Sequence, residues 1–176
     1  MIKVAFLRAL NVGKTNRIKM NELKSLFIDI GFSNIRCYLQ SGNILFETNM
    51  NSNVDLEEKI EKFIQKRFLL EIKVLVRDPD QLFNIISKSM YCKKYLFDNL
   101  YVTFLKYALI NNEIDKLIKL NSENDRVEIL GNDLIIFCKD KYHKSKLNNS
   151  IIENKLKTVA TSRKLNTINK LLEMLE

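Results

Sequence analysis

Residues 1–48, MIKVAFLRALNVGKTNRIKMNELKSLFIDIGFSNIRCYLQSGNILFET, contain the patterns that decide the fold of the first half of this chain. At the start of this stretch, Ile2, Val4 and Phe6 are separated from one another by single intervening residues. A period of two predicts a half-buried strand, because successive side chains of a strand point to opposite faces of the sheet. We therefore expect Ile2, Val4 and Phe6 to face the core.

The polar segment that follows, residues 9–19, predicts a loop in which Gly13 adopts a positive φ without strain. Apolar residues then return with the spacing of an amphipathic helix from Met20 to Ile30. Gly31 stands in the position where many helices end. The sequence thus predicts a strand, a loop and a helix in that order.

Two further strands are predicted at residues 34–40 and 43–48, joined by the two-residue hairpin loop Ser41-Gly42. A helix at residues 55–68 and a strand at residues 70–77 complete the order βαββαβ. This order is typical of a ferredoxin-like sandwich, in which two helices cover one face of a four-stranded sheet with the strand order 4-1-3-2. The fold class is therefore α+β. The predicted core consists of Ile2, Val4, Phe6, Leu23, Phe27, Ile35, Cys37, Leu39, Ile44, Phe46, Ile60, Ile64, Ile72, Val74 and Val76.

A boundary is expected after residue 77, because Asp78-Pro79 marks a helix start and proline is favoured at the first helical position. Residues 1–77 would form the first unit. Residues 78–176 would form a second, imperfect ferredoxin-like α+β unit that ends with a helix at residues 162–175.

Three short motifs of the first unit, Phe6-Leu7-Arg8, Asn11-Val12-Gly13 and Tyr38-x-Gln40-Ser41-Gly42-Asn43, resemble the bacterial family known as domain of unknown function 1697 (DUF1697). Near the C-terminus, Thr161-Ser162-Arg163 and Asn166-Thr167 resemble a degraded copy of another motif of that family. The chain departs from the family pattern at Ala9 and Lys14, which are usually glycine. The resemblance implies a fold and a set of motif positions, and it implies no reaction.

The composition of the 176-residue chain indicates a globular protein, with 46% hydrophobic residues, four glycines and one proline. No apolar run approaches the length of a membrane-spanning helix and no signal peptide is recognisable, so we expect a cytoplasmic protein without membrane contacts. Cys37, Cys92 and Cys138 are expected to be reduced thiols. With His143 as the single histidine and no Cys-x-x-Cys pair, neither a metal site nor a cofactor is predicted.

The formal net charge of +8 is concentrated in two regions. Residues 1–20 contain five basic residues and no acid, and residues 139–170 contain nine basic residues against two acids. Because this charge is mostly lysine and Tyr38 is the only aromatic residue on the expected open face of the sheet, base stacking is disfavoured. Nucleic acid binding, if it occurs, should be weak and nonspecific.

In the expected topology, the loop after the first strand and the hairpin after the second strand emerge at the same edge of the sheet. Hydrogen-bond donors dominate this rim, which suits a small anionic ligand that carries a phosphate or a carboxylate. We expect Arg163 to return to the same rim from the first turn of the last helix. The candidate ligand-binding residues are Arg8, Asn11, Gly13, Lys14, Asn16, Arg17, Gln40, Ser41, Gly42, Asn43 and Arg163.

Two alternatives remain open for these residues. Asn11, Ser41 and Asn43 could simply satisfy backbone groups of turns, as such side chains commonly do. The same rim could also belong to an enzyme of unknown reaction, although a Ser-His-Asp arrangement would require His143, which lies in a lysine-rich stretch without a motif. No pair of carboxylates marks the rim, so in an enzyme general acid–base catalysis would fall to Lys14, Tyr38 or a group of the substrate.

Overall fold

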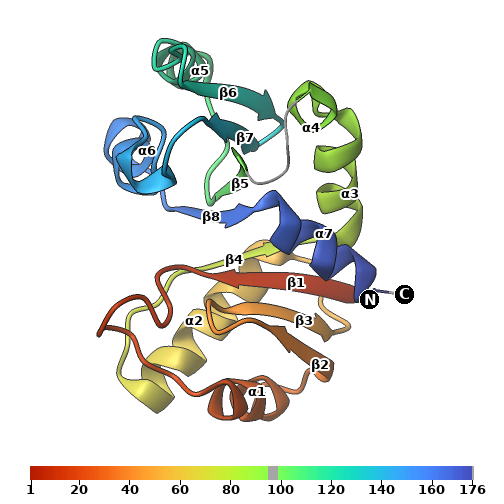
Figure 1. Ribbon diagram of the computed structural model, residues 1–176. Coiled ribbons are helices and arrows are strands. Elements are labelled where there is room, and N and C mark those ends of the chain that lie inside the picture. The colour runs from red at the N-terminus through yellow and green to blue at the C-terminus, as the bar shows by residue number, and fades with distance from the viewer. Residues whose placement is uncertain (95–98, 176) are drawn as a thin grey trace. The chain divides into compact units, whose positions relative to one another are not determined.

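The computed structural model describes residues 1–94 and 99–175, and these form two compact units, Met1–Gln81 and Leu82–Glu176 (Figure 1). Each unit contains one four-stranded antiparallel sheet, so the fold is of the α+β class. The division lies four residues after the position expected from Asp78-Pro79, inside helix α3 (Pro79–Lys88). None of the helices in the described residues is long and apolar enough to cross a membrane.

The first unit follows the order βαββαβ. Its sheet has the strand order β2-β3-β1-β4, with every neighbouring pair antiparallel. Helices α1 and α2 lie against one face of this sheet (Figure 1). The elements are β1 (Ile2–Leu7), α1 (Met20–Asp29), β2 (Ser33–Tyr38), β3 (Asn43–Glu47), α2 (Asn53–Phe68) and β4 (Val74–Arg77).

The face of β1 that packs against the helices is the opposite of the predicted one. Ala5 and Leu7 lie in the core with the helices, whereas Val4 and Phe6 point to the other face of the sheet. The pairing of Ala5 with Ile44 fixes this register. The sequence pattern of β1 could not show which side chains face the helices. Residues 4–7 are all fully buried, so β1 has no solvated side that polar residues would mark.

The hairpin between β2 and β3 also differs from the prediction. The strand β2 ends at Tyr38, and residues 39–42 form a four-residue loop. Leu39 has a φ of 59° and is 54% exposed, so it does not lie in the core, where the prediction had placed it. The other predicted positions of this hairpin, Ile35, Cys37 and Ile44, do lie in or against the core.

Carboxylates of α2 cap the outer edge of β4. Glu57 Oε1 accepts a hydrogen bond from the Val76 backbone nitrogen at 2.8 Å, and Glu61 Oε1 accepts one from the Val74 nitrogen at 3.0 Å. Glu57 and Glu61 are four residues apart and share one face of the helix. The two carboxylates satisfy donors that an edge strand would otherwise expose to another chain.

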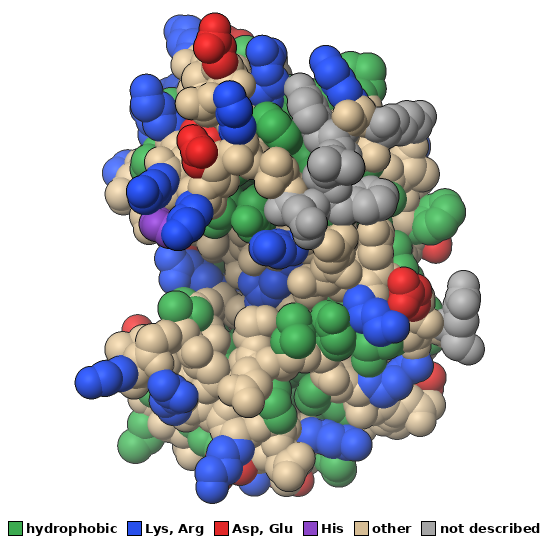
Figure 2. All heavy atoms as spheres, in the orientation of Figure 1, with side chains coloured by type: hydrophobic (Ala, Val, Ile, Leu, Met, Phe, Trp, Pro, Cys, Tyr) green, Lys and Arg blue, Asp and Glu red, His purple; other side chains and the backbone are tan. Residues whose placement is uncertain are grey.

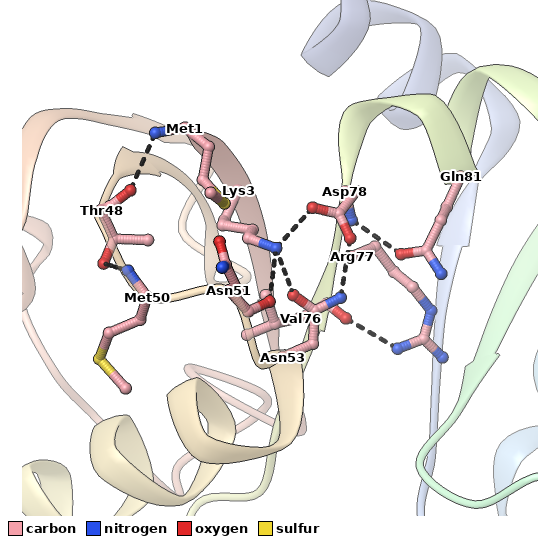
Figure 3. A network of polar contacts seen from close by, with 10 residues as sticks. All are labelled: Met1, Lys3, Thr48, Met50, Asn51, Asn53, Val76, Arg77, Asp78 and Gln81. Carbon is pink, nitrogen blue, oxygen red and sulfur yellow. Dashed lines mark hydrogen bonds and ion pairs between the residues drawn. The ribbon is translucent and has the colours of Figure 1, made fainter.

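A buried ammonium group connects the start of β1 with the end of β4 (Figure 3). The side chain of Lys3 is only 3% exposed, and its Nζ lies 2.6 Å from Asp78 Oδ1 and 2.8 Å from Asn53 Oδ1. The Asn51 carbonyl accepts the third bond at 3.1 Å. All three donors of the ammonium group are therefore satisfied, which burial of this charge requires.

The second unit contains a complete βαββαβ order as well. Its sheet has the strand order β6-β7-β5-β8, again antiparallel throughout. Besides α3, the elements are α4 (Met90–Lys94), β5 (Leu100–Leu105), α5 (Asn111–Ile118), β6 (Asp125–Leu130), β7 (Asp133–Cys138), the 3-10 turn η2 (Tyr142–Lys144), α6 (Asn149–Leu156), β8 (Ala160–Lys164) and α7 (Leu165–Glu173).

The predicted helix over residues 162–175 begins too early. Residues 160–164 form the edge strand β8, which pairs with β5, and α7 starts only at Leu165. Thr161 is buried at the strand and caps no helix. As on β4, a carboxylate satisfies the edge, because Glu153 Oε1 of α6 accepts from the Ala160 nitrogen at 2.9 Å.

Replacing Lys3 with methionine should destabilise the protein strongly. The variant keeps the apolar stem and leaves acceptors of Asp78, Asn53 and Asn51 without their donor, which should cost about 2–4 kcal/mol in the free energy of unfolding. The matched control is Lys62→Met on the exposed surface of α2. This substitution should change the free energy of unfolding by no more than about 0.5 kcal/mol. Urea unfolding measures both, and equal effects would contradict the structural role of Lys3.

Candidate functional site

The loop after β1 is tightly folded through four residues with positive φ. Ala9, Asn11, Gly13 and Asn16 have φ values between 51° and 60°. The loop begins where the Arg8 nitrogen donates to the Lys73 carbonyl at 2.8 Å. Left-handed conformations favour glycine, so Ala9 holds its position against a conformational cost.

Asn11 joins this loop to the hairpin. Its Nδ2 donates to the carbonyls of Ile18 at 3.0 Å and Gln40 at 2.9 Å, and its Oδ1 accepts from the Ile18 nitrogen at 3.0 Å. The loop and the hairpin therefore meet at one edge of the sheet, as the expected topology required. The side chain of Asn11 satisfies backbone groups, which is the first of the two alternatives drawn from the sequence.

The hairpin is held in a similar way by Asn43 and Gly42. The buried Asn43 side chain donates to the Tyr38 carbonyl at 2.9 Å and to Ser41 Oγ at 3.1 Å. Gly42 has a φ of 75°, and its carbonyl accepts from the Leu7 nitrogen at 2.9 Å. A Cβ atom at position 42 would lie 2.7 Å from Leu7 Cβ, so the hairpin depends on glycine there.

Of the other polar residues of the rim, one holds the loop through a hydrogen bond and two are exposed at the surface. Asn16 Nδ2 donates to the Ala9 carbonyl at 3.3 Å, which again holds the loop. Lys14 is exposed, and so is Arg17, whose Nη2 donates to the Gly13 carbonyl at 2.5 Å. The exposed cations of the loop are thus carried on a backbone that asparagine side chains fix.

A pocket of about 540 Å³ opens where the loop enters α1. Of the predicted rim residues, Asn11, Arg17 and Gln40 line it. Lys19, Asn21 and Glu22 also line it, and the sequence analysis had not singled them out. Their only signal in the sequence is their place at the predicted helix start. The full lining is Asn11, Arg17, Ile18, Lys19, Met20, Asn21, Glu22 and Gln40.

Charges of both signs meet in this pocket. Arg17 and Lys19 supply cations, and the first turn of α1 directs its backbone N–H groups toward the start of the helix. The Glu22 carboxylate shares the lining and accepts from the Lys19 nitrogen at 3.2 Å. Cations, backbone N–H groups and one carboxylate therefore meet in the lining of a single pocket.

Arg163 lies on a strand, where the sequence analysis had placed it in the first turn of a helix. It belongs to β8 and pairs with Val102 of β5. Its Nη1 donates to Thr161 Oγ1 at 2.8 Å and to the Ser162 carbonyl at 2.9 Å. Burial lowers the pKa of the Arg163 guanidinium to about 10, which still leaves it protonated at neutral pH.

Ser162 is the centre of a hydroxyl cluster in the second unit. Its Oγ lies 2.5 Å from Thr103 Oγ1, 2.6 Å from the Tyr142 hydroxyl and 2.7 Å from Asn149 Oδ1. The hydroxyls of Ser162, Thr103 and Tyr142 carry one proton each, so Ser162 donates to at most one of these neighbours. Ser162 is therefore held by side-chain hydrogen bonds at the centre of this cluster.

The described residues contain no group of side chains suited to hold a metal ion. His143 is exposed in η2, and no group of three or more His, Cys, Asp or Glu side chains in the described part of the chain could hold a metal ion. The three cysteines are free thiols. Burial raises the pKa of all three, that of Cys138 to about 11, which opposes thiolate formation at neutral pH.

Comparisons with known proteins identify a family and a similar fold. Residues 1–134 match the family model described as "Protein of unknown function (DUF1697)". No curated protein matches the sequence. A solved structure, that of the conserved bacterial protein SP0830 from Streptococcus pneumoniae, superposes with a TM-score of 0.78 at 19% sequence identity and covers 99% of this chain and 98% of the other. At that identity the likeness shows the fold alone.

Substitutions at positions 42 and 9 should change stability in opposite directions. Gly42→Ala forces a Cβ into Leu7 at a positive φ and should cost about 2–4 kcal/mol. Ala9→Gly removes the conformational strain of an alanine at positive φ but also makes the unfolded chain more flexible. The net effect should be a gain of up to about 1 kcal/mol in the free energy of unfolding. Urea unfolding measures both, and a stabilising Gly42→Ala would contradict the hairpin packing.

The Tyr142 hydroxyl should ionise unusually late. Burial chiefly raises its pKa to about 12 from an ordinary value of 10. Because the folded pKa lies above the unfolded one, the stability that neutral Tyr142 contributes is complete below pH 10 and is lost as the pH rises toward 12. In an absorbance titration at 295 nm, Tyr142→Phe should remove the tyrosine ionisation that occurs at the highest pH. If that high-pH ionisation is unchanged in the variant, its assignment to Tyr142 is wrong.

Proposed function

The chain belongs to the DUF1697 family, and we propose that its first unit binds a small ligand with a phosphate or carboxylate group at the rim formed by residues 8–19 and 40–43. The observation that supports this proposal is the pocket at the start of α1, because cationic side chains and helix N–H groups occur there together. Each of these features attracts an anion, and their effects add.

Within the rim, the residues have different roles in this proposal. Arg17, Lys19 and Gln40 offer donors to the ligand. Asn11 lines the pocket and also fixes the backbone around it. Of the remaining predicted residues, Lys14 is an exposed cation outside the pocket lining. The others belong to the loop and the hairpin that carry these donors, and they are Arg8, Gly13, Asn16, Ser41, Gly42 and Asn43. That Arg163 also contacts the ligand stays a prediction of the sequence motif.

The mixed charge of the pocket indicates which small anions it suits. The Glu22 carboxylate would repel a second anionic group close to it, and it accepts hydroxyl or amine donors readily. We therefore favour a ligand that carries hydroxyl or amine groups beside one anionic group. An enzyme acting on such a ligand is the second possibility.

Two coarser features are also part of the proposal. We infer that both units are versions of a ferredoxin-like sandwich, since each has the element order βαββαβ and the sheet order 4-1-3-2 in its own numbering. We infer a cytoplasmic location because Cys37, Cys92 and Cys138 are all free, as is usual in reducing compartments.

Titration with inorganic phosphate tests the site itself. We expect Arg17→Gln and Lys19→Gln each to weaken phosphate binding about tenfold, because one charge-assisted hydrogen bond contributes roughly 1.5–3 kcal/mol and 1.4 kcal/mol corresponds to a factor of ten. The control is Lys14→Gln, an exposed cation of the same loop that does not line the pocket. Chemical shift changes of the backbone amides of residues 19–22 report binding at this place.

The control distinguishes phosphate binding at the pocket from general attraction to the positive charge of the protein. If Lys14→Gln weakens phosphate binding as much as Arg17→Gln, or if the amides of residues 19–22 do not respond, the proposed site is wrong. Native mass spectrometry of the unmodified protein would then identify the physiological ligand through any small molecule retained on purification.

A further inference from the structure

The segment 139–157 of the second unit carries half of the net charge of the chain. It contains six lysines against Asp140 and Glu153, a formal charge of +4 out of +8. The carboxylate of Glu153 faces inward and accepts from the Ala160 nitrogen at 2.9 Å. The six lysines are Lys139, Lys141, Lys144, Lys146, Lys155 and Lys157, and every one of them is exposed.

The backbone that carries these lysines is firmly attached to the unit. Tyr142 stacks on Tyr101 with ring centroids 4.5 Å apart, and its hydroxyl bonds to Asn149 and Ser162. Leu147 is fully buried in the core of the unit, and Ser145 is also buried. The anchoring residues thus alternate along the chain with Lys141, Lys144 and Lys146, which are turned to solvent.

Further hydrogen bonds fix the turn between the lysines. The Lys146 nitrogen donates to Asp125 Oδ2 at 3.1 Å. Asn148 donates to the Ser145 carbonyl at 2.8 Å and caps α6 by accepting from the Ile151 nitrogen at 3.1 Å. Because these bonds hold the backbone, binding a polyanion would cost only the ordering of the lysine side chains.

The surface of this segment is cationic and polar, without exposed large apolar side chains. The large hydrophobic residues that are exposed in the described part of the chain all lie outside residues 139–157. Figure 2 shows Lys and Arg side chains around the single histidine, at the left of the view. Helix α2 differs, since over its whole length four basic residues are matched by four acidic residues.

We propose that the segment 139–157 is a contact surface for the sugar–phosphate backbone of a nucleic acid. Lysines at fixed positions neutralise successive phosphates and release their counterions, which requires no apolar or base-specific contact. Tyr142, the aromatic residue of the segment, has its ring stacked on Tyr101 and does not offer a platform for bases. Binding through this surface is therefore independent of base sequence.

The alternatives for a basic surface fit the segment less well. A peripheral membrane surface usually adds apolar side chains that insert between lipids, and the segment exposes none. A stable protein interface needs buried aromatic or apolar anchors, which are also missing from its exposed residues. A regular polyanion with closely spaced charges is the partner that six lysines alone can bind.

Fluorescence anisotropy with a labelled 20-base-pair duplex of mixed sequence tests the proposal on the full-length protein. For six phosphate contacts, the logarithm of the association constant should fall with the logarithm of the salt concentration with a slope of about −5. The triple variant Lys141→Gln, Lys144→Gln, Lys146→Gln should lose about three units of that slope and bind at least tenfold more weakly at low salt. Duplexes of a second sequence should bind equally well.

The matched control removes three exposed lysines from other surfaces, as Lys62→Gln, Lys66→Gln, Lys119→Gln. It should keep the slope and affinity of the unmodified protein. An equal loss in both triple variants would show that net charge alone governs binding and would overturn the proposal. Binding to vesicles that contain phosphatidylserine in the absence of binding to the duplex would overturn it in favour of a membrane surface. Melting temperatures of both variants verify that they are folded.

Discussion

The buried ammonium group of Lys3 is the interaction on which the first unit depends most. It lies on the central strand β1, and its acceptors come from the connector to α2, from α2 itself and from the end of β4. Asn53 completes the arrangement by donating to Asp78 Oδ2 at 3.1 Å. A charge at this depth is tolerated only with every donor paired. The three segments are therefore held at fixed distances from β1. The loop and the hairpin lie at the opposite end of the same sheet.

Both units solve the problem of the open sheet edge with a helix side chain. Glu57 and Glu61 serve β4, and Glu153 serves β8, in each case with a carboxylate that accepts from backbone nitrogens of the edge strand. The other edge of the second sheet has a similar device, since Asn121 Oδ1 accepts from the Val127 nitrogen at 2.7 Å. These bonds satisfy backbone donors of three edge strands that would otherwise be open to a second chain.

The rim of the first unit shows how structural and functional demands divide a set of polar residues. Asn11, Asn16 and Asn43 have side chains that hold the loop and the hairpin, so a motif rich in asparagine is explained largely by backbone hydrogen bonds. In the ligand site that we propose, the donors are cations and amides at the start of α1. In the second unit, the Ser162 side chain is likewise held by hydrogen bonds to its neighbours.

The sequence by itself determined the element order of the first unit, the helix faces and the meeting of loop and hairpin. Those features follow from local patterns: helical spacing, turn residues, and the alternation of Ile35 and Cys37 on a strand with one solvated side. Only the tertiary structure decided the facing of β1, because residues 4–7 are buried on both sides and carry no polar alternation. It also decided the strand β8, where Thr161, Ser162 and Arg163 fit a strand or a helix start equally well until they pair with β5. The role of Lys3 depends likewise on acceptors that the local pattern does not specify, since a lysine is usually a solvated residue and only its three-dimensional surroundings show otherwise.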